Sequence, residues 1–226
     1  MIFGISAKKQ CGKDLFLKIW NALILTKDGE PLTDDEIANL KDDLLVRGAE
    51  YCGTGTYEKR FFASSLKGIC AVLFGCSPSD FESEEFKESL IPEKFRPNML
   101  GANTYREALQ KIGTELFRNK FHNDVWVLSS TSGYDSEKCR WFFTDVRFPN
   151  EKRIIEDLGG KVIRIEKEGQ DDTDCHSSEK ALDDYHFDIV VKNNFVFEDY
   201  ARQIYDIMIA EGIFDYNRTL DDRLPF

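Results

Sequence analysis

A Gly-Lys pair at positions 12 and 13 stands between an apolar run and an amphipathic segment, and this arrangement restricts the fold most. Residues 1–6 are short and apolar, which predicts a buried strand. Beyond the polar loop, apolar side chains recur at helical spacing, at Leu15, Phe16, Ile19, Trp20, Leu23 and Ile24. A strand that leads through such a loop into a helix directs backbone N–H groups at an anion.

The loop from Ala7 to Asp14 reads A-K-K-Q-C-G-K-D, against the Walker pattern G-x-x-x-x-G-K-[ST]. Ala7 replaces the first glycine, and Asp14 replaces the hydroxyl residue. The context still predicts that Lys13 neutralises charge on the β- and γ-phosphates of ATP. The alternative is a solvated loop in which Asp14 merely favours the helix dipole. The residues expected to hold ATP are Gln10, Cys11, Gly12, Lys13, Asp14 and Leu15.

Asp14 raises a question of charge, because a carboxylate beside a triphosphate is repulsive unless a cation lies between them. Aspartate oxygens ligate Mg²⁺ as a hydroxyl would. The loop therefore predicts Mg²⁺ as a cofactor, with Asp14 as one ligand.

Strands and helices alternate along the rest of the chain. Further strands are expected at 60–63, 141–144, 161–165 and 187–191, and helices at 66–74, 104–112, 114–121, 150–158 and 198–210. Gly113 is expected to join two separate helical segments. The acidic stretch 27–58 is interpreted as a peripheral excursion with a surface helix at 34–45. This order predicts an α/β three-layer sandwich around a mainly parallel sheet.

Composition narrows the class of partner. The chain has 226 residues, which suits a single domain, and its formal net charge of −11 disfavours nucleic acid and anionic membranes as partners. No apolar run is long enough to span a membrane. The six cysteines form no CxxC pair, which favours reduced thiols in a cytoplasm.

Several later blocks share an order and spacing with a known family. They include Phe62-Ala63 with Lys67, then Arg106, Gly113-Thr114-Glu115, Trp126-Val127, Asp145-x-Arg147, Glu151, Gly169-Gln170 and His176-x-x-Glu179. Together with Lys9 and Gly12-Lys13-Asp14, these blocks resemble the deoxynucleoside monophosphate kinases of tailed bacteriophages. The chain departs at Leu15, where some members have a threonine that offers a hydroxyl to the nucleotide, and the segment 27–58 has no match.

This resemblance implies the nucleotide-kinase form of the P-loop fold and transfer of phosphate from ATP to a deoxynucleoside monophosphate. It implies a helical, acceptor-binding insertion at about 66–125, a lid-like loop at about 168–182, and a homodimer in the host cytoplasm. Asp145 ends an apolar strand and is expected to bind the metal, while the fork of Arg147 bridges the two phosphates. The residues expected to bind the acceptor are Lys9, Lys67, Arg106, Gly113, Thr114, Trp126 and Glu151.

Simpler interpretations stand beside these. Asp145 and Arg147 suit a surface ion pair, Glu151 suits a helix N-terminus, and Thr114 suits a helix cap. Another small-molecule kinase, resembling dephospho-coenzyme A kinase, and a non-catalytic phage protein remain as alternatives. A GTPase is disfavoured, because the nearest guanine-type string, residues 119–122, lacks the aspartate.

Overall fold

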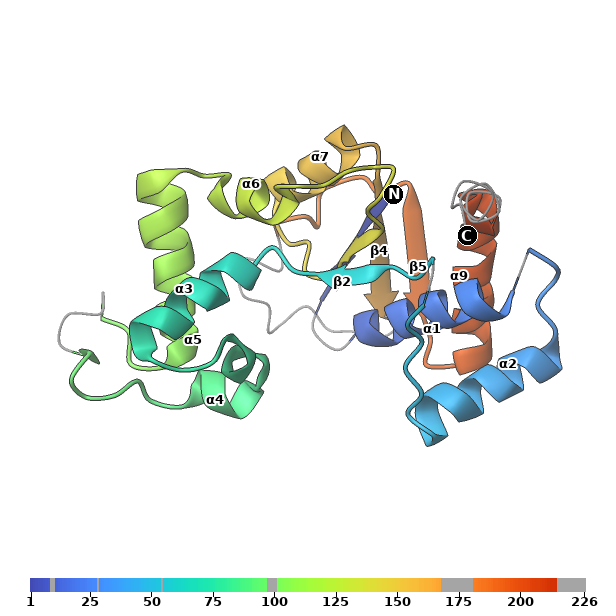
Figure 1. The fold of residues 1–226 in the computed structure, drawn as a ribbon, viewed down its shortest axis with the longest axis horizontal. Coiled ribbons are helices and arrows are strands. Elements are labelled where there is room, and N and C mark those ends of the chain that lie inside the picture. Colours follow the sequence, from blue (N-terminus) through green and yellow to red (C-terminus); the bar gives the residue numbers. More distant parts are fainter. Residues whose placement is uncertain (9–10, 28, 54, 97–100, 168–180, 215–226) are drawn as a thin grey trace. The chain divides into compact units, whose positions relative to one another are not determined.

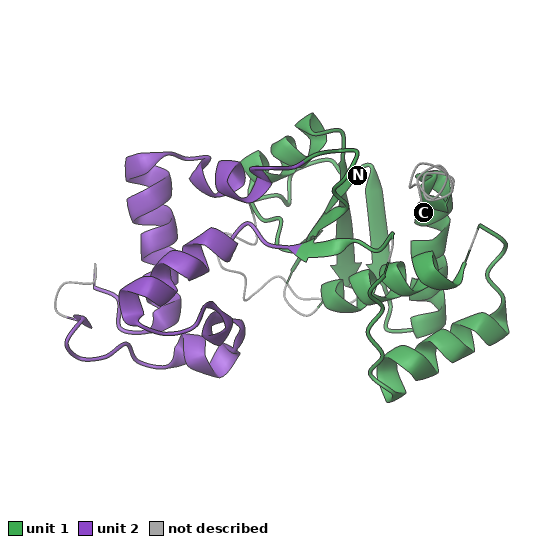
Figure 2. Ribbon diagram, in the orientation of Figure 1, with its two compact units in different colours: residues 1–59, 135–226 green, residues 60–134 purple. Residues whose placement is uncertain are grey.

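The computed structural model describes residues 1–226 except 9–10, 28, 54, 97–100, 168–180 and 215–226 (Figure 1). The chain forms two compact units (Figure 2). The first contains residues 1–59 and 135–226, and the second contains residues 60–134. The expected insertion at 66–125 lies inside the second unit. None of the described helices is long and apolar enough to cross a membrane.

A five-stranded sheet with the order β2-β3-β1-β4-β5 forms the centre of the first unit. Its strands are β1 (Ile2–Ala7), β2 (Glu58–Arg60), β3 (Trp141–Phe143), β4 (Lys161–Lys167) and β5 (Ile189–Asn193). Strand β1 pairs in parallel with β3 and β4, and β4 pairs in parallel with β5. The carboxyl ends of β1, β3, β4 and β5 therefore share one edge, where ligands bind in open α/β sheets.

Helices cover both faces of this sheet, which confirms the three-layer α/β sandwich. Helices α1 (Lys13–Thr26) and α9 (Phe197–Ala210) cover one face, and α7 (Pro149–Asp157) covers the other. Helix α2 (Asp34–Lys41), which continues into the π-helical η1 (Asp42–Val46), packs on α9. Phe3 and Ile5 face the core with α1 and α9. Gly4, between them, faces Ile155 of α7, because successive residues of a strand point to opposite faces.

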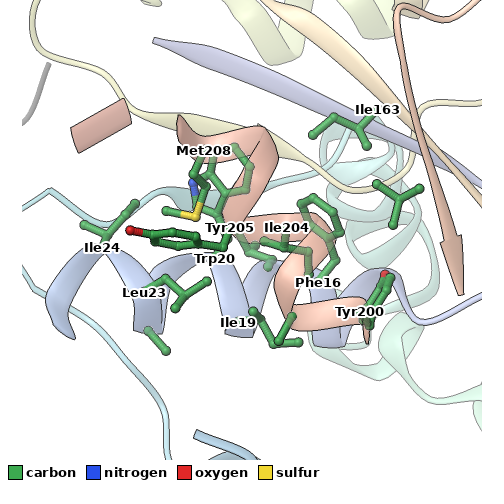
Figure 3. Packing of buried hydrophobic residues seen from close by; sticks show 14 of the residues in the cluster. Phe16, Ile19, Trp20, Leu23, Ile24, Ile163, Tyr200, Ile204, Tyr205 and Met208 are labelled. Atoms are coloured by element: carbon green, nitrogen blue, oxygen red, sulfur yellow. The ribbon is translucent and has the colours of Figure 1, made fainter. Parts of the chain in front are cut away.

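The main core fills the space between the sheet, α1 and α9 (Figure 3). Trp20 and Phe16 are fully buried, and their rings stack with centroids 5.8 Å apart. Burial of each such side chain stabilises the fold by roughly 1.5–3 kcal/mol. Ile37 and Leu40 of α2 are buried in the same core. The helix expected at 34–45 is present as α2 and η1. The interpretation of 27–58 as a peripheral excursion was wrong in one respect, since this helix contributes apolar side chains to the core.

The second unit is helical and has its own core. It contains α3 (Ser64–Phe74), the 3₁₀ turn η2 (Pro78–Glu82), α4 (Glu84–Glu88), α5 (Tyr105–Gln110), the π-helical η4 (Lys111–Phe121) and α6 (Val125–Thr131). Phe81, Ile91 and Ala108 are fully buried within it. Aromatic rings from α3, α4 and α5 pack on one another, as between Phe86 and Tyr105 with centroids 4.4 Å apart.

Two expected boundaries were wrong. The second strand occupies Glu58–Arg60 rather than 60–63. Gly113 does not separate two helices, because α5 continues directly into η4 across it. A Cβ at Gly113 would lie 2.7 Å from a methyl group of Leu66, so a larger residue there would make the Leu66 side chain shift.

Candidate active site

The phosphate-type loop lies at the carboxyl end of β1 and leads into α1. Gly12 is the residue before the helix, and its φ of 87° is in the left-handed region that favours glycine. Phe16 donates its backbone N–H to the Gly12 carbonyl at 3.0 Å, which starts the helical ladder. Lys13 is the first helical residue, so it lies among the unpaired N–H groups of the helix N-terminus. Lys9 and Gln10 lie outside the described residues.

Lys13 is surrounded by charges of both signs. Burial lowers the pKa of its ammonium group most, and the positive charge of Arg147 lowers it further. Asp14 and Asp145 act in the opposite direction, and Lys59 adds to the lowering. Residues from three segments of the first unit therefore act on one lysine. Such a cluster of cations suits an anionic ligand.

Asp14 has a partner that the sequence did not indicate. Lys59 Nζ of β2 lies 2.6 Å from Asp14 Oδ1, and both side chains are partly exposed. The two residues are 45 positions apart, and Lys59 belongs to none of the motifs, so no local pattern could have found this pair.

The segment after β3 places Asp145 and Arg147 near the end of β1. The backbone N–H of Val146 donates to the Ile5 carbonyl at 3.1 Å. Glu151 Oε2 accepts the N–H groups of Arg147 at 2.8 Å and of Phe148 at 3.1 Å. Glu151 is almost fully buried. Its carboxylate therefore holds the turn that carries Arg147, a role that a direct substrate contact does not explain.

Metal binding can be tested against the donor set. Among the described residues, no three His, Cys, Asp or Glu side chains gather into a metal-holding group. Asp14 and Asp145 supply carboxylate oxygens, which suit Mg²⁺ when phosphates and water complete its shell. Thr144 Oγ1 is buried without a hydrogen-bond partner in the described part of the chain, which suits a bound water. The residues present therefore fit a magnesium ion carried by a nucleotide better than an ion held by protein alone.

Lys67 and Arg106 belong to the second unit. Lys67 of α3 forms an ion pair with Glu82 at 2.7 Å and lies over the Phe61 ring, 5.1 Å from its centroid. Arg106 of α5 contacts Glu84 at 2.6 Å and also donates to Glu88. Each expected acceptor-binding cation is thus paired with carboxylates of its own unit.

Trp126 lies in helix α6 and is only 3% exposed. Its indole N–H donates to the Gly113 carbonyl at 3.0 Å, and its ring packs on Phe117 with centroids 5.0 Å apart. In this conformation the indole offers a base almost no surface, so stacking requires its neighbours to move. Thr114 is exposed on η4. The other two tryptophans, Trp20 and Trp141, are also buried.

The lid-like loop was expected at about 168–182, and most of it, with Gly169, Gln170, His176 and Glu179, lies outside the described residues. Among the described residues, the cysteines at 11, 52, 70, 76 and 139 form no disulfide.

Two comparisons with known proteins match the chain. The family model described as deoxynucleotide monophosphate kinase matches residues 73–204. A protein of Acanthamoeba polyphaga mimivirus, named as a provisional deoxynucleotide monophosphate kinase, is 30% identical over 161 residues. The match covers 65% of this chain and 80% of the viral protein.

Proposed function

Because the chain belongs to the deoxynucleotide monophosphate kinase family, we propose that it transfers the γ-phosphate of ATP to a deoxynucleoside monophosphate. The products are ADP and a deoxynucleoside diphosphate. The observation that carries this proposal is the loop after β1, where the left-handed Gly12 is followed by Lys13 at the start of α1. The charges of Arg147, Asp14, Asp145 and Lys59 act on the same lysine. The resemblance to phage enzymes supports a role in phage DNA precursor synthesis.

The donor nucleotide is held by the loop before α1. Backbone N–H groups from Gln10 to Leu15 bind the phosphate oxygens, and the Lys13 ammonium neutralises the β- and γ-phosphates. The lowered pKa of Lys13 follows from burial and from Arg147, and a bound polyanion reverses this effect by stabilising the charged form.

The transfer joins a phosphate oxygen of the acceptor to the γ-phosphorus. The bond between that phosphorus and the β–γ bridging oxygen breaks, and ADP leaves with the electron pair. About six negative charges meet in this step, so catalysis rests on positioning and charge neutralisation. Arg147 spans acceptor and transferring phosphates with its planar fork. When bound, Mg²⁺ neutralises phosphate charge, and Asp14 and Asp145 are the residues that would hold it.

The acceptor is assigned to the second unit, while Glu151 acts indirectly by holding the turn that carries Arg147. Lys67 and Arg106 supply positive charge for its monophosphate, and the exposed Thr114 contacts its base or sugar. Contacts from the buried Gly113 and Trp126 require the side chains that cover them to move. The resemblance supports these assignments, and the cations on α3 and α5 are compatible with them.

A coupled ATP-consumption assay against all deoxynucleoside and nucleoside monophosphates tests the proposal. We expect turnover with at least one deoxynucleotide, and its loss in Lys13→Ala without loss of the fold. If Lys13→Ala kept more than about a tenth of the wild-type kcat, Lys13 would not be the phosphate-binding lysine of the loop. A charged donor in that role stabilises the transition state by several kcal/mol. Turnover with dephospho-coenzyme A alone would favour the other kinase class. Failure to bind ATP at any Mg²⁺ concentration would favour a non-catalytic protein.

A further inference from the structure

Asn193, the last residue of β5, connects two segments that are far apart in the sequence. Its side-chain Nδ2 donates to the Cys11 carbonyl at 3.1 Å, in the loop before α1. Its Oδ1 accepts the backbone N–H of Phe195 at 2.9 Å, in the turn that leads to α9. Asn193 is only 6% exposed. A carbonyl on one side and an N–H on the other determine the amide orientation, and an ionised carboxylate, which only accepts, cannot satisfy both.

A second contact holds the same part of the loop. Tyr200 of α9 donates its hydroxyl to the Gly12 carbonyl at 3.3 Å. Gly12 also lies so close to Asn193 that a Cβ would be 2.6 Å from Nδ2. The two residues immediately before Lys13 are therefore held by the end of β5 and the start of α9. These contacts lie entirely within the first unit.

We propose that Asn193 is a positioning residue for the donor phosphate loop, which it braces through the Cys11 carbonyl. The inference rests on the proposed function, in which backbone N–H groups of this loop bind the phosphates of ATP. Such groups bind best when their directions are set before the ligand arrives. Loss of the carboxamide leaves a buried carbonyl without its donor and lets the loop open locally.

The adjacent residue provides a matched control. Asn194 has the same side chain, and its Oδ1 accepts the N–H of Val196 at 3.0 Å. Its Nδ2 donates to Asp199 at 2.8 Å, within the same turn and α9. Asn194 thus shapes the turn as Asn193 does, while its hydrogen bonds do not reach the loop.

Asn193→Asp and Asn193→Ala should be compared with Asn194→Asp and Asn194→Ala in steady-state kinetics. Aspartate at 193 keeps the acceptor for Phe195 but places a carboxylate oxygen against the Cys11 carbonyl. We expect both Asn193 variants to raise the KM for MgATP about tenfold, with the KM for the acceptor within about twofold of wild type. The Asn194 variants should keep both constants. An unchanged MgATP KM in Asn193→Asp, or an equal rise in both constants, would overturn the inference.

A second readout needs no nucleotide. Cys11 is buried and Cys52 is exposed, so iodoacetamide labelling of each peptide, followed by mass spectrometry, compares the loop with an internal reference. We expect the Cys11-to-Cys52 rate ratio to rise about tenfold in both Asn193 variants and to stay within about twofold in the Asn194 variants. Partly buried Cys139, in the first unit, should keep its labelling rate, which excludes unfolding of that unit, and buried Cys70 should stay slow, which excludes unfolding of the second unit. An unchanged Cys11 ratio overturns the brace, whereas a wild-type protein that phosphorylates no nucleotide overturns the proposed function.

Discussion

Lys59 gives Asp14 a partner that changes the charge balance of the donor loop. From the sequence alone, a carboxylate beside triphosphate made sense only with a metal ion between them. The ion pair at 2.6 Å offers a second way to offset that charge. Because both side chains are partly exposed, the pair contributes little to stability, and its effect should be on binding.

Lys59→Met should therefore weaken the binding of metal-free ATP more than the binding of MgATP. Two unit charges about 4 Å apart at an effective dielectric of about 20 repel by roughly 4 kcal/mol before salt screening. Without Lys59, only Mg²⁺ separates Asp14 from the phosphates. Asp14→Asn in the Lys59→Met background should restore binding of metal-free ATP and lower the rate with Mg²⁺. Isothermal titration with Mg²⁺ or EDTA measures the affinities. An equal loss for both forms of ATP would mean that Asp14 does not face the nucleotide.

Arg147→Lys should be far from conservative. An ammonium group cannot span two phosphoryl oxygens as a planar guanidinium does. We expect kcat/KM to fall by at least roughly 10²-fold, the order found when one transition-state donor is removed. Steady-state kinetics with saturating MgATP measures this, and the melting temperature of the variant serves as its control. Near wild-type activity of Arg147→Lys would mean that Arg147 is a surface residue that does not bridge the phosphates.

The pattern of neighbouring residues predicted the candidate site residues that lie in one loop. It missed residues from distant parts of the sequence that the fold brings to this loop. Gly12 and Lys13 were found because a strand, a polar loop and a helix are consecutive in the chain. Lys59 and Asn193 reach the same loop from β2 and β5, and their neighbours in the sequence carry no matching signal. The burial of Trp126 was also missed, because an apolar segment does not reveal which of its side chains face the core.

At the scale of elements, helix α7 and the turn before it are joined by hydrogen bonds. Pro149 begins the helix, and Glu151 reaches back to the N–H groups of residues 147 and 148. The anionic carboxylate is favoured there because helix N-termini carry partial positive charge. The position of Arg147 is thus coupled to the start of α7.

Glu151→Ala should lower both stability and rate. Two partly buried N–H groups would lose this acceptor, which costs at most about 1–3 kcal/mol per group. We expect a reduced free energy of unfolding in urea and a lower kcat, with the KM for the acceptor little changed. Glu151→Gln should lie between wild type and alanine, because the amide oxygen still accepts but carries no charge. An increase in acceptor KM at unchanged stability would instead assign Glu151 to the substrate.

The order of most strands and helices could be predicted because their apolar residues follow the period of each element. β1, β3, β4, α1, α3, α7 and α9 lie within about three residues of their expected bounds. The failures have physical causes. Gly113 interrupts the pattern yet lies inside the helical run of η4, where it is buried close to Leu66. The acidic composition of 27–58 concealed the buried face of α2, whose Ile37 and Leu40 are spaced for a helix.

At the scale of the whole molecule, the proposed donor and acceptor groups belong to different units. Lys13, Arg147 and Lys59 are in the first unit, whereas Lys67 and Arg106 are in the second. If the proposed transfer is right, some substitutions should change only the affinity for the donor, and others, in the other unit, only the affinity for the acceptor.

Lys67→Gln and Arg106→Gln should weaken binding of the deoxynucleoside monophosphate and leave MgATP binding unchanged. Removing one charged hydrogen-bond donor costs about 1.5–3 kcal/mol, which is roughly a tenfold to hundredfold loss of affinity. Titration calorimetry with each ligand alone measures the two affinities. Lys94→Gln removes an exposed lysine of the same unit and should change neither.

Arg106 needs a further control, because its guanidinium also binds Glu84 and Glu88. Glu88→Gln weakens that ion pair but keeps the cation. If Arg106 binds the acceptor phosphate, Glu88→Gln should retain acceptor affinity or raise it, since a competing carboxylate charge is gone. If Arg106 only supports the packing of α4 on α5, Glu88→Gln and Arg106→Gln should lower the melting temperature and the acceptor affinity together. Parallel losses in these two variants, or a loss of MgATP affinity as large as that of the acceptor, would remove Arg106 from the acceptor site.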